Sequence, residues 1–246
     1  MRLLAAALVL SLASAGCLSG LTGGVSAKDL VSDADYDTWV IEIDHTSGMR
    51  PDSSVVNGML SRVQAVVSKD TVRVEYSDSN LPSKDRWTRG ALQDLHESRQ
   101  DQSTKGDTVT SHILFVDGRY EDPDVLGFAV GHEWIVIFSE RIDEGCDNAG
   151  PLGLPVCNNN DRQRAHTAVL VHEVGHIMGL VNNGIPMVNP HEATSCGGQS
   201  DSGHSNNENS VMYCGVNTVG LFGLQSIPTE FDADDRRDLC AAGGKC

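Results

Sequence analysis

The chain has 246 residues, enough for one domain of ordinary size preceded by a leader. Aromatic residues make up only 5% of it and glycines number 25, so we expect an aliphatic core connected by many loops. The formal net charge of −16 argues against nucleic-acid binding, which requires a basic surface, and against electrostatic docking on anionic lipid.

The first residues predict an export signal. Arg2 precedes an apolar run over residues 3–12, which is too short for a stable membrane-spanning helix. Small residues at 13–16 lead to Cys17, a pattern that resembles a lipoprotein signal. We therefore expect a signal peptide over residues 1–16, a lipid anchor at Cys17, a polar tether over 17–36 and a location on the cell surface. The alternative is ordinary signal cleavage nearby, which would leave a freely secreted protein.

The other cysteines also favour export. Six remain when Cys17 is set aside, and an even number in an exported domain is typical of disulfides. None falls in a CxxC pair, so we do not expect a cysteine zinc site. As a hypothesis, short loops favour three pairings: Cys146–Cys157, Cys196–Cys214 and Cys240–Cys246.

The first half of the domain predicts strands and helices in alternation. Residues 39–43 are typical of a strand, and residues 53–68 place apolar side chains on one face of a helix. Strict alternation over 71–76 predicts a second strand. Residues 77–108 are polar, with a short helix expected around 90–100.

The second half begins with strands at 108–116, 125–130 and 134–139, the last two joined by residues 131–133 in a hairpin. A loop over 143–162 precedes the strongest helix, 161–180. About 50 irregular residues follow, and a closing helix over 229–241 takes Thr229 as its cap. This order predicts a single α+β domain over residues 37–246, with a loop-rich C-terminal part.

The strongest helix carries a motif with clear chemistry. His172 and His176 are four residues apart and therefore lie on one helix face, where two imidazoles can bind one zinc ion. Glu173 is placed to take a proton from a zinc-activated water. The flanking residues are almost all apolar, so the helix should be buried. Two histidines and a glutamate would then be buried without purpose if they bound no metal.

A catalytic zinc needs a third protein ligand. His172 to Gly179 follows the HExxHxxGxxH pattern of the metzincins, but Asn182 stands where the third His is expected. The segment from His204 to Tyr213 resembles the archaemetzincins, in which the third His is followed by Cys, four residues, Cys, one residue and Met. Met212 matches that Met, and residues 181–203 would be an insertion.

This resemblance implies a metzincin-like fold, with a mixed, mostly five-stranded twisted sheet and an active-site helix. One catalytic Zn²⁺ on His172, His176 and His204 is implied, with His191 or Asn182 as alternative third ligands, and Met212 in a tight turn beneath the metal. Because Ser205 and Ser210 replace both Cys, the resemblance implies no second, structural zinc. In metzincins the antiparallel edge strand binds extended substrate; here 125–130 or 134–139 could be that edge.

We therefore expect a zinc endopeptidase that acts on extended polypeptides, with Glu173 as general base and the chain a monomer. Tyr213 could stabilise an oxyanion, and packing against the sheet is the alternative. Acidic loops could bind Ca²⁺, but no pattern supports this. The rival hypothesis is a surface-anchored, non-catalytic metal-binding or adhesion module, which the missing His at position 182 favours.

Overall fold

The computed structural model describes residues 24–148, 157–195, 202–217 and 227–246. The predicted signal peptide and Cys17 lie outside these residues. A five-stranded mixed sheet runs through the centre, in the order β2 (Thr71–Tyr76), β1 (Thr38–His45), β4 (Thr108–Val116), β7 (Trp134–Phe138), β6 (Gly127–Val130). The first four strands are parallel, whereas β6 pairs antiparallel with β7. This confirms the predicted fold class.

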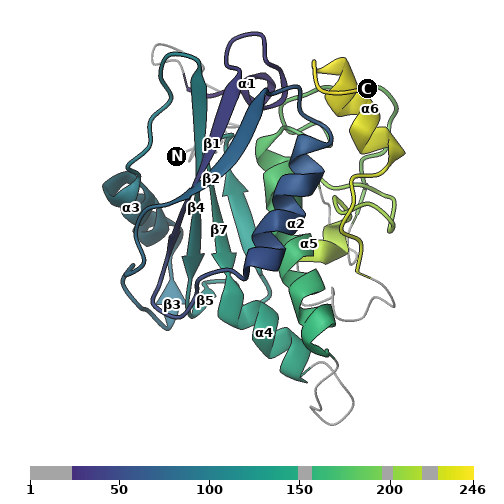
Figure 1. Cartoon of the computed structure of the whole chain (residues 1–246). Helices are drawn as coiled ribbons and strands as arrows, with labels where there is room; N and C mark the ends of the chain where they lie inside the picture. Colours follow the sequence, from purple (N-terminus) through teal and green to yellow (C-terminus); the bar gives the residue numbers. More distant parts are fainter. Residues whose placement is uncertain (1–23, 149–156, 196–201, 218–226) are drawn as a thin grey trace, which may run out of the picture.

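Helices cover both faces of the sheet (Figure 1). On one face lie α2 (Ser53–Gln64) and α5 (Asn159–Ile177), and on the other lies α3 (Arg89–Arg99). The central strands β1 and β4 are therefore buried on both faces, as is usual for parallel strands. Side chains of β1 alternate accordingly, so that Trp39, Ile41 and Ile43 pack with α2 and α5 in the main core. A smaller core lies beneath α3.

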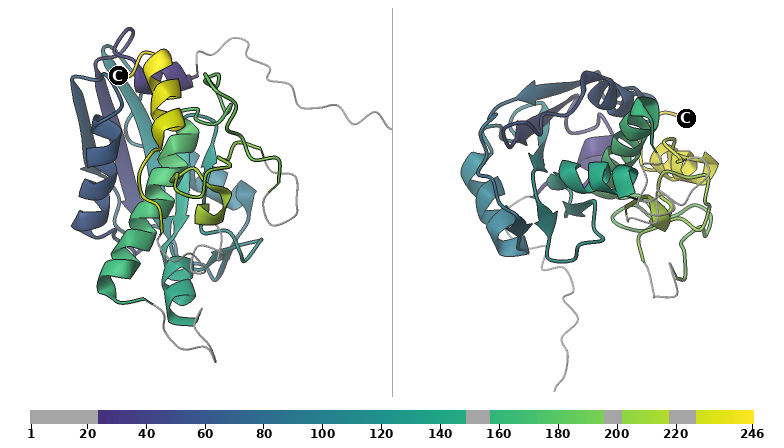
Figure 2. Two further views of the ribbon diagram at one scale, coloured as in Figure 1. Left: turned by 90° about the vertical axis from the view of Figure 1, so that its right-hand side faces the viewer. Right: turned by 90° about the horizontal axis from the view of Figure 1, so that it is seen from below.

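The remaining elements lie around this frame. Helix α4 (Ser139–Asn148) follows β7, and α1 (Ala27–Val31), α6 (Ala233–Ala241) and the 3₁₀ helix η2 (Cys214–Asn217) lie near the loop-rich side of α5 (Figure 2). Two short strands, β3 (Arg86–Trp87) and β5 (Arg119–Tyr120), form a separate parallel pair. No helix in the described ranges is long and apolar enough to span a bilayer.

Several sequence expectations are corrected. The tether predicted over 17–36 is too long, because Leu30 and Val31 of α1 are fully buried in the main core. Residues 139–148 form α4, so the first six residues of the predicted 143–162 loop are helical. Helix α6 begins at Ala233 rather than near Thr229, because the side chain of Asp232 accepts from two backbone amides of the first turn and caps it.

Two predicted disulfides are confirmed, Cys146–Cys157 and Cys240–Cys246. The first joins the end of α4 to the residues that begin α5. Cys214 is also disulfide-bonded, but Cys196, its predicted partner, lies outside the described residues.

Candidate metal centre

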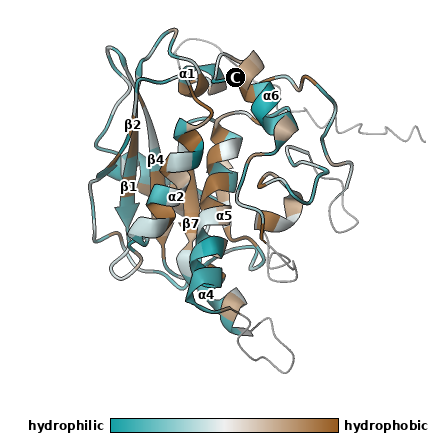
Figure 3. Cartoon of the chain, turned by 45° about the vertical axis from the view of Figure 1, so that its right-hand side comes forward, coloured by the Kyte–Doolittle hydropathy of each residue, from teal (hydrophilic) through white to brown (hydrophobic). Residues whose placement is uncertain are grey.

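The sequence of helix α5 has a capping box at its start and a mostly apolar stretch after it, and both features favour a buried helix. Asn158 accepts from the backbone amide of Asp161, and the Asp161 side chain accepts from that of Asn158, which completes a capping box. Figure 3 shows the change along α5 from hydrophilic first turns to a mostly hydrophobic remainder. Every residue from Thr167 to Gly175 is buried, so this helix holds its polar side chains rigidly.

Three histidines meet at the end of α5. His172 and His176 come from the helix and His204 from the loop after it, and their ligand nitrogens lie within 4.8 Å of one another. The ring centroids are 4.7 Å apart for His172 and His176, 5.1 Å for His172 and His204, and 4.9 Å for His176 and His204. The Nε2 atoms of His172 and His176 are 3.1 Å apart. We call these three residues the histidine triad.

Backbone contacts hold the triad in place. His172 Nδ1 donates to the carbonyl oxygen of Val211 at 2.7 Å, which leaves Nε2 without a proton and directed at the other two rings. The carbonyl of His204 accepts from the amide of Ala193 at 2.7 Å. The tautomer of His172 and the backbone position of His204 are therefore set by backbone groups, which do not titrate.

Met212 packs directly beneath the triad helix. Its side chain is fully buried, and a Cβ built on Gly175 would lie only 2.2 Å from its sulfur. Gly175 therefore lets the methionine approach the helix between the two histidines. The turn is held by the Met212 amide, which donates to Ser210 Oγ at 2.9 Å, and by the Ser205 amide, which donates to the Met212 carbonyl at 2.7 Å.

Glu173 is fully buried beside the triad, and neither carboxylate oxygen has a hydrogen-bond partner within the described part of the chain. Burial raises the pKa of this carboxyl well above its ordinary value. A buried carboxylate with no internal partner is costly, so an external partner at this point is expected.

The two imidazoles from α5 are held neutral. Burial lowers the pKa of His172 well below its usual value, with His176 and His204 adding to the effect. Burial, followed by the charge of His204, lowers the pKa of His176 to about 3. Three imidazoles that converge on one point are the donor set of a catalytic zinc site, so these residues fit Zn²⁺.

A cavity of about 620 Å³ lies against this centre. One wall is the sheet-edge strand β6, with Phe128 and Ala129, and another includes Glu173, His176 and His204. His176 and His204 of the triad therefore face a space large enough to admit part of a ligand. The cavity runs along β6, the first of the two strands proposed from the sequence as the edge.

The other predicted site residues in the described ranges do not belong to the triad. Asn182 lines the cavity with a left-handed backbone (φ 63°). His191 is buried in a separate cluster with Asp235 and Asp238. Tyr213 packs against the main core and is not among the residues that line the cavity.

One cavity residue was not predicted. His132, in the β6–β7 turn, lines the cavity, and its Nδ1 donates to the Ile177 carbonyl at 2.9 Å. The sequence signal for this position was weak: His132 lies in a predicted hairpin beside an edge strand.

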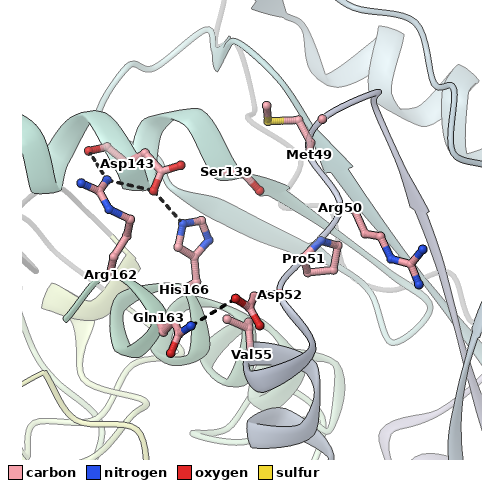
Figure 4. A pocket seen from close by; sticks show the side chains of 11 residues that line it. Met49, Arg50, Pro51, Asp52, Val55, Ser139, Asp143, Arg162, Gln163 and His166 are labelled. Atoms are coloured by element: carbon pink, nitrogen blue, oxygen red, sulfur yellow. Dashed lines mark hydrogen bonds and ion pairs between the residues drawn. The ribbon is translucent and has the colours of Figure 1, made fainter. Parts of the chain in front are cut away.

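A second, smaller pocket of about 210 Å³ lies away from the triad, where β1 and β7 end (Figure 4). Asp143 of α4 accepts from His166 Nε2 at 3.1 Å and from Arg162 at 3.0 Å. These partners lower the pKa of Asp143, although burial opposes the shift. These contacts join α4 to α5. Asp143, Arg162 and His166 are paired with one another, so none of the three offers an unpaired charge to the pocket.

Comparison with solved structures finds two similar folds. An archaemetzincin from Methanopyrus kandleri has a TM-score of 0.53 and 17% identity, over 85% of this chain and 96% of that one. A zinc-dependent peptidase from Methanocorpusculum labreanum has a TM-score of 0.53 and 15% identity, over 81% and 99%. No protein-family model and no curated protein matches the chain.

Proposed function

We propose that the protein is a zinc-dependent endopeptidase. The observation that carries this proposal is the meeting of three imidazoles, two of which line one cavity together with a buried glutamate. The names of the two similar structures, an archaemetzincin and a zinc-dependent peptidase, support the same chemistry.

Each residue has a defined role in this proposal. His172, His176 and His204 would hold the zinc ion, which when bound lowers the pKa of water and polarises a peptide carbonyl. Glu173 accepts a proton from the attacking water at its carboxylate and passes it to the leaving amine. Burial raises the pKa of this carboxyl, which strengthens it as a proton acceptor in the first step.

Strand β6 supports a polypeptide as substrate. It forms one edge of the sheet, and no other strand in the described ranges pairs with its outer side. An extended peptide can add to such an edge through backbone hydrogen bonds, which recognise the chain largely without regard to its sequence. The cavity beside β6 would then receive a side chain near the scissile bond.

The first test compares oxidised, zinc-loaded protein with its Glu173→Gln variant on an unfolded protein such as casein. We expect cleavage by the parent and a loss of at least about 100-fold in the variant, because general acid–base catalysis contributes this much or more. The variant should keep its zinc, which serves as the control for folding. Equal cleavage by both proteins would contradict the mechanism. Zinc binding with no cleavage by either would favour the non-catalytic module.

A second test addresses the third ligand. His204→Ala should release zinc on dialysis, because two imidazoles alone hold the ion weakly. His132→Ala is the matched control, since His132 lines the same cavity but lies outside the triad. Retention of zinc by His204→Ala would assign the third position to another group, such as Asn182.

We also propose export and lipid anchoring through Cys17. The disulfides Cys146–Cys157 and Cys240–Cys246 support an oxidising compartment. Membrane fractionation of cells that express the full chain tests the anchor. We expect the protein in the membrane fraction and the Cys17→Ala variant in the soluble or secreted fraction, whereas an unchanged distribution would argue against lipidation.

A further inference from the structure

A second group of buried ionisable side chains lies behind the triad, where α6 meets the loop that follows α5. His191, Asp235 and Asp238 are only 3%, 0% and 1% exposed. His191 Nε2 lies 3.4 Å from Asp235 Oδ1 and 3.7 Å from Asp238 Oδ2. None of these three atoms has any other hydrogen-bond partner in the described part of the chain, so their interaction with one another is their main compensation for burial.

The second polar atom of each of these three side chains forms hydrogen bonds with neighbouring residues. His191 Nδ1 donates to the Asn189 carbonyl at 2.9 Å. Asp238 Oδ1 accepts from the amide of Val188 at 2.7 Å. Asp235 Oδ2 accepts from Ser210 Oγ at 2.5 Å and from the Asp232 amide at 3.0 Å. The cluster is therefore oriented from both sides, with the charged atoms turned towards one another.

His191 carries a positive charge in this setting. The hydrogen bond and the charge of Asp235, with a further contribution from Asp238, raise the pKa of His191 to about 9 although burial opposes the shift. The cluster at neutral pH is then one imidazolium between carboxylates of a single helix. The half-buried Asp234 lies on the same helix, and its pKa is lowered first by the hydrogen bond from Asn189 and further by the charges of Arg237 and His191.

Short connections link this cluster to the triad. Ser210, which donates to Asp235, accepts from the amide of Met212 through the same hydroxyl. The His191 carbonyl accepts from the Asn206 amide at 2.8 Å, two residues after His204. The loop that carries His204 and Met212 is thus attached at both ends to the His191 cluster.

We propose that His191, Asp235 and Asp238 form an ionic clamp that holds the loop bearing His204 and Met212 in position for metal binding. They are positioning residues, because none of them lies in the triad. The inference rests on the proposed function only in taking the triad as a zinc site, and its test reads metal affinity rather than cleavage.

The experiment uses the full chain and measures the zinc dissociation constant by competition with a chromophoric chelator. We expect Asp238→Asn and His191→Gln each to weaken zinc binding by about 10-fold or more, as loss of groups that orient ligands does elsewhere. The visible spectrum of the Co²⁺-loaded protein should change in both, because the third nitrogen is displaced. Glu208→Gln is the matched control, since it removes one exposed charge from the same loop and should leave affinity and spectrum unchanged.

The double variant His191→Gln/Asp238→Asn separates charge pairing from general damage. In a clamp, the double variant should cost clearly less than the sum of the two single changes, because either single change already breaks the ion pair between His191 and Asp238. If Asp238→Asn does not fold, Ser210→Ala serves instead, since it removes only the hydroxyl that links Asp235 to Met212. It should still weaken zinc binding.

Two results would overturn the clamp. One is folded variants, shown by circular dichroism, that keep the parental zinc affinity and Co²⁺ spectrum. The other is a second metal equivalent that persists in His172→Ala/His176→Ala but is lost in Asp238→Asn, because the cluster would then bind an ion instead of pairing with His191. A parent that binds zinc but cleaves nothing would contradict the proposed function alone and leave the clamp intact.

Discussion

Gly175 lies between the two histidines of α5, on the side of the helix that faces Met212. A glycine inside a helix ordinarily costs about 1 kcal/mol relative to alanine. Glycine is needed at this position because a side chain has no room: an added Cβ would lie 2.2 Å from Met212 Sδ and 3.2 Å from Phe231 Cε1. Both neighbours are buried, so neither can move into solvent.

We therefore predict that Gly175→Ala destabilises the protein by about 1–3 kcal/mol, because overpacking of a buried contact outweighs the gain in helix propensity. Urea unfolding of the zinc-free protein measures this change. Gly90→Ala in α3 is the control, as its Cβ would meet nothing within 4 Å and should stabilise by up to about 1 kcal/mol. A stabilising Gly175→Ala would mean that Met212 does not pack against the helix.

His191 gives a prediction on pH. Its pKa in the folded protein is raised to about 9, chiefly by Asp235, against about 6.5 in the unfolded chain. Its contribution to stability is therefore fully present below about pH 6.5 and is lost as the pH rises through 9. Between these values the free energy of unfolding should fall by roughly 3 kcal/mol more in the parent than in His191→Gln. Equal pH dependence of the two proteins would show that His191 is not charged in the fold.

At the scale of elements, β1 and β4 contribute the side chains of a polar network on the sheet face that α3 covers. Glu42, Asp44 and His112 are fully buried, with ligand atoms within 4.8 Å of one another. All of these atoms are engaged within the fold: His112 bridges Asp44 and His96, and the Glu42 carboxylate accepts from the amides of Asp101 and Gln102. We therefore assign this group a structural role.

Glu42→Gln tests that role. The new amide group would face backbone donors that need an acceptor, so we predict a loss of about 1–3 kcal/mol in unfolding free energy. Zinc content should not change, because the network lies on the opposite face of the sheet from the triad. Glu75→Gln on the neighbouring β2 is the control, since its ion pair with Arg73 is on the surface and contributes little. A loss of zinc in Glu42→Gln would contradict the structural assignment.

The elements that the sequence predicted well are those with strong periodicity. Strands β1, β2 and β4 and helix α5 follow from patterns that depend on near neighbours, and the meeting of His172 with His176 needs only helix geometry. Helix α1 was missed because five residues give too short a pattern, and its burial depends on contacts with residues far along the chain. The clamp was missed for the same reason: 44 residues separate His191 from Asp235, and no local pattern joins them.

At the scale of the whole molecule, α1 changes where the folded domain begins. A Cβ on Gly179 or Gly184, just after the triad helix, would lie 2.5 or 3.1 Å from Ala27. The Lys69 side chain donates to the Ser32 carbonyl. The fold therefore includes residues from about 24 onward. Only residues 18–23 separate it from the proposed anchor, a length that spans at most about 20 Å. The proposed anchor would thus keep the cavity close to the membrane surface.

The last prediction tests whether α1 is part of the domain. Leu30→Ala should lower the free energy of unfolding by about 2–4 kcal/mol, because Leu30 is fully buried in the main core and its removal leaves a cavity. Lys28→Ala, on the exposed side of the same helix, should change it by less than about 0.5 kcal/mol. Denaturant unfolding of both variants and the parent gives these values. If Leu30→Ala matched Lys28→Ala, residues 24–36 would act as the tether that the sequence first indicated. The proposed anchor could then hold the domain further from the membrane, because a longer free segment would separate the two.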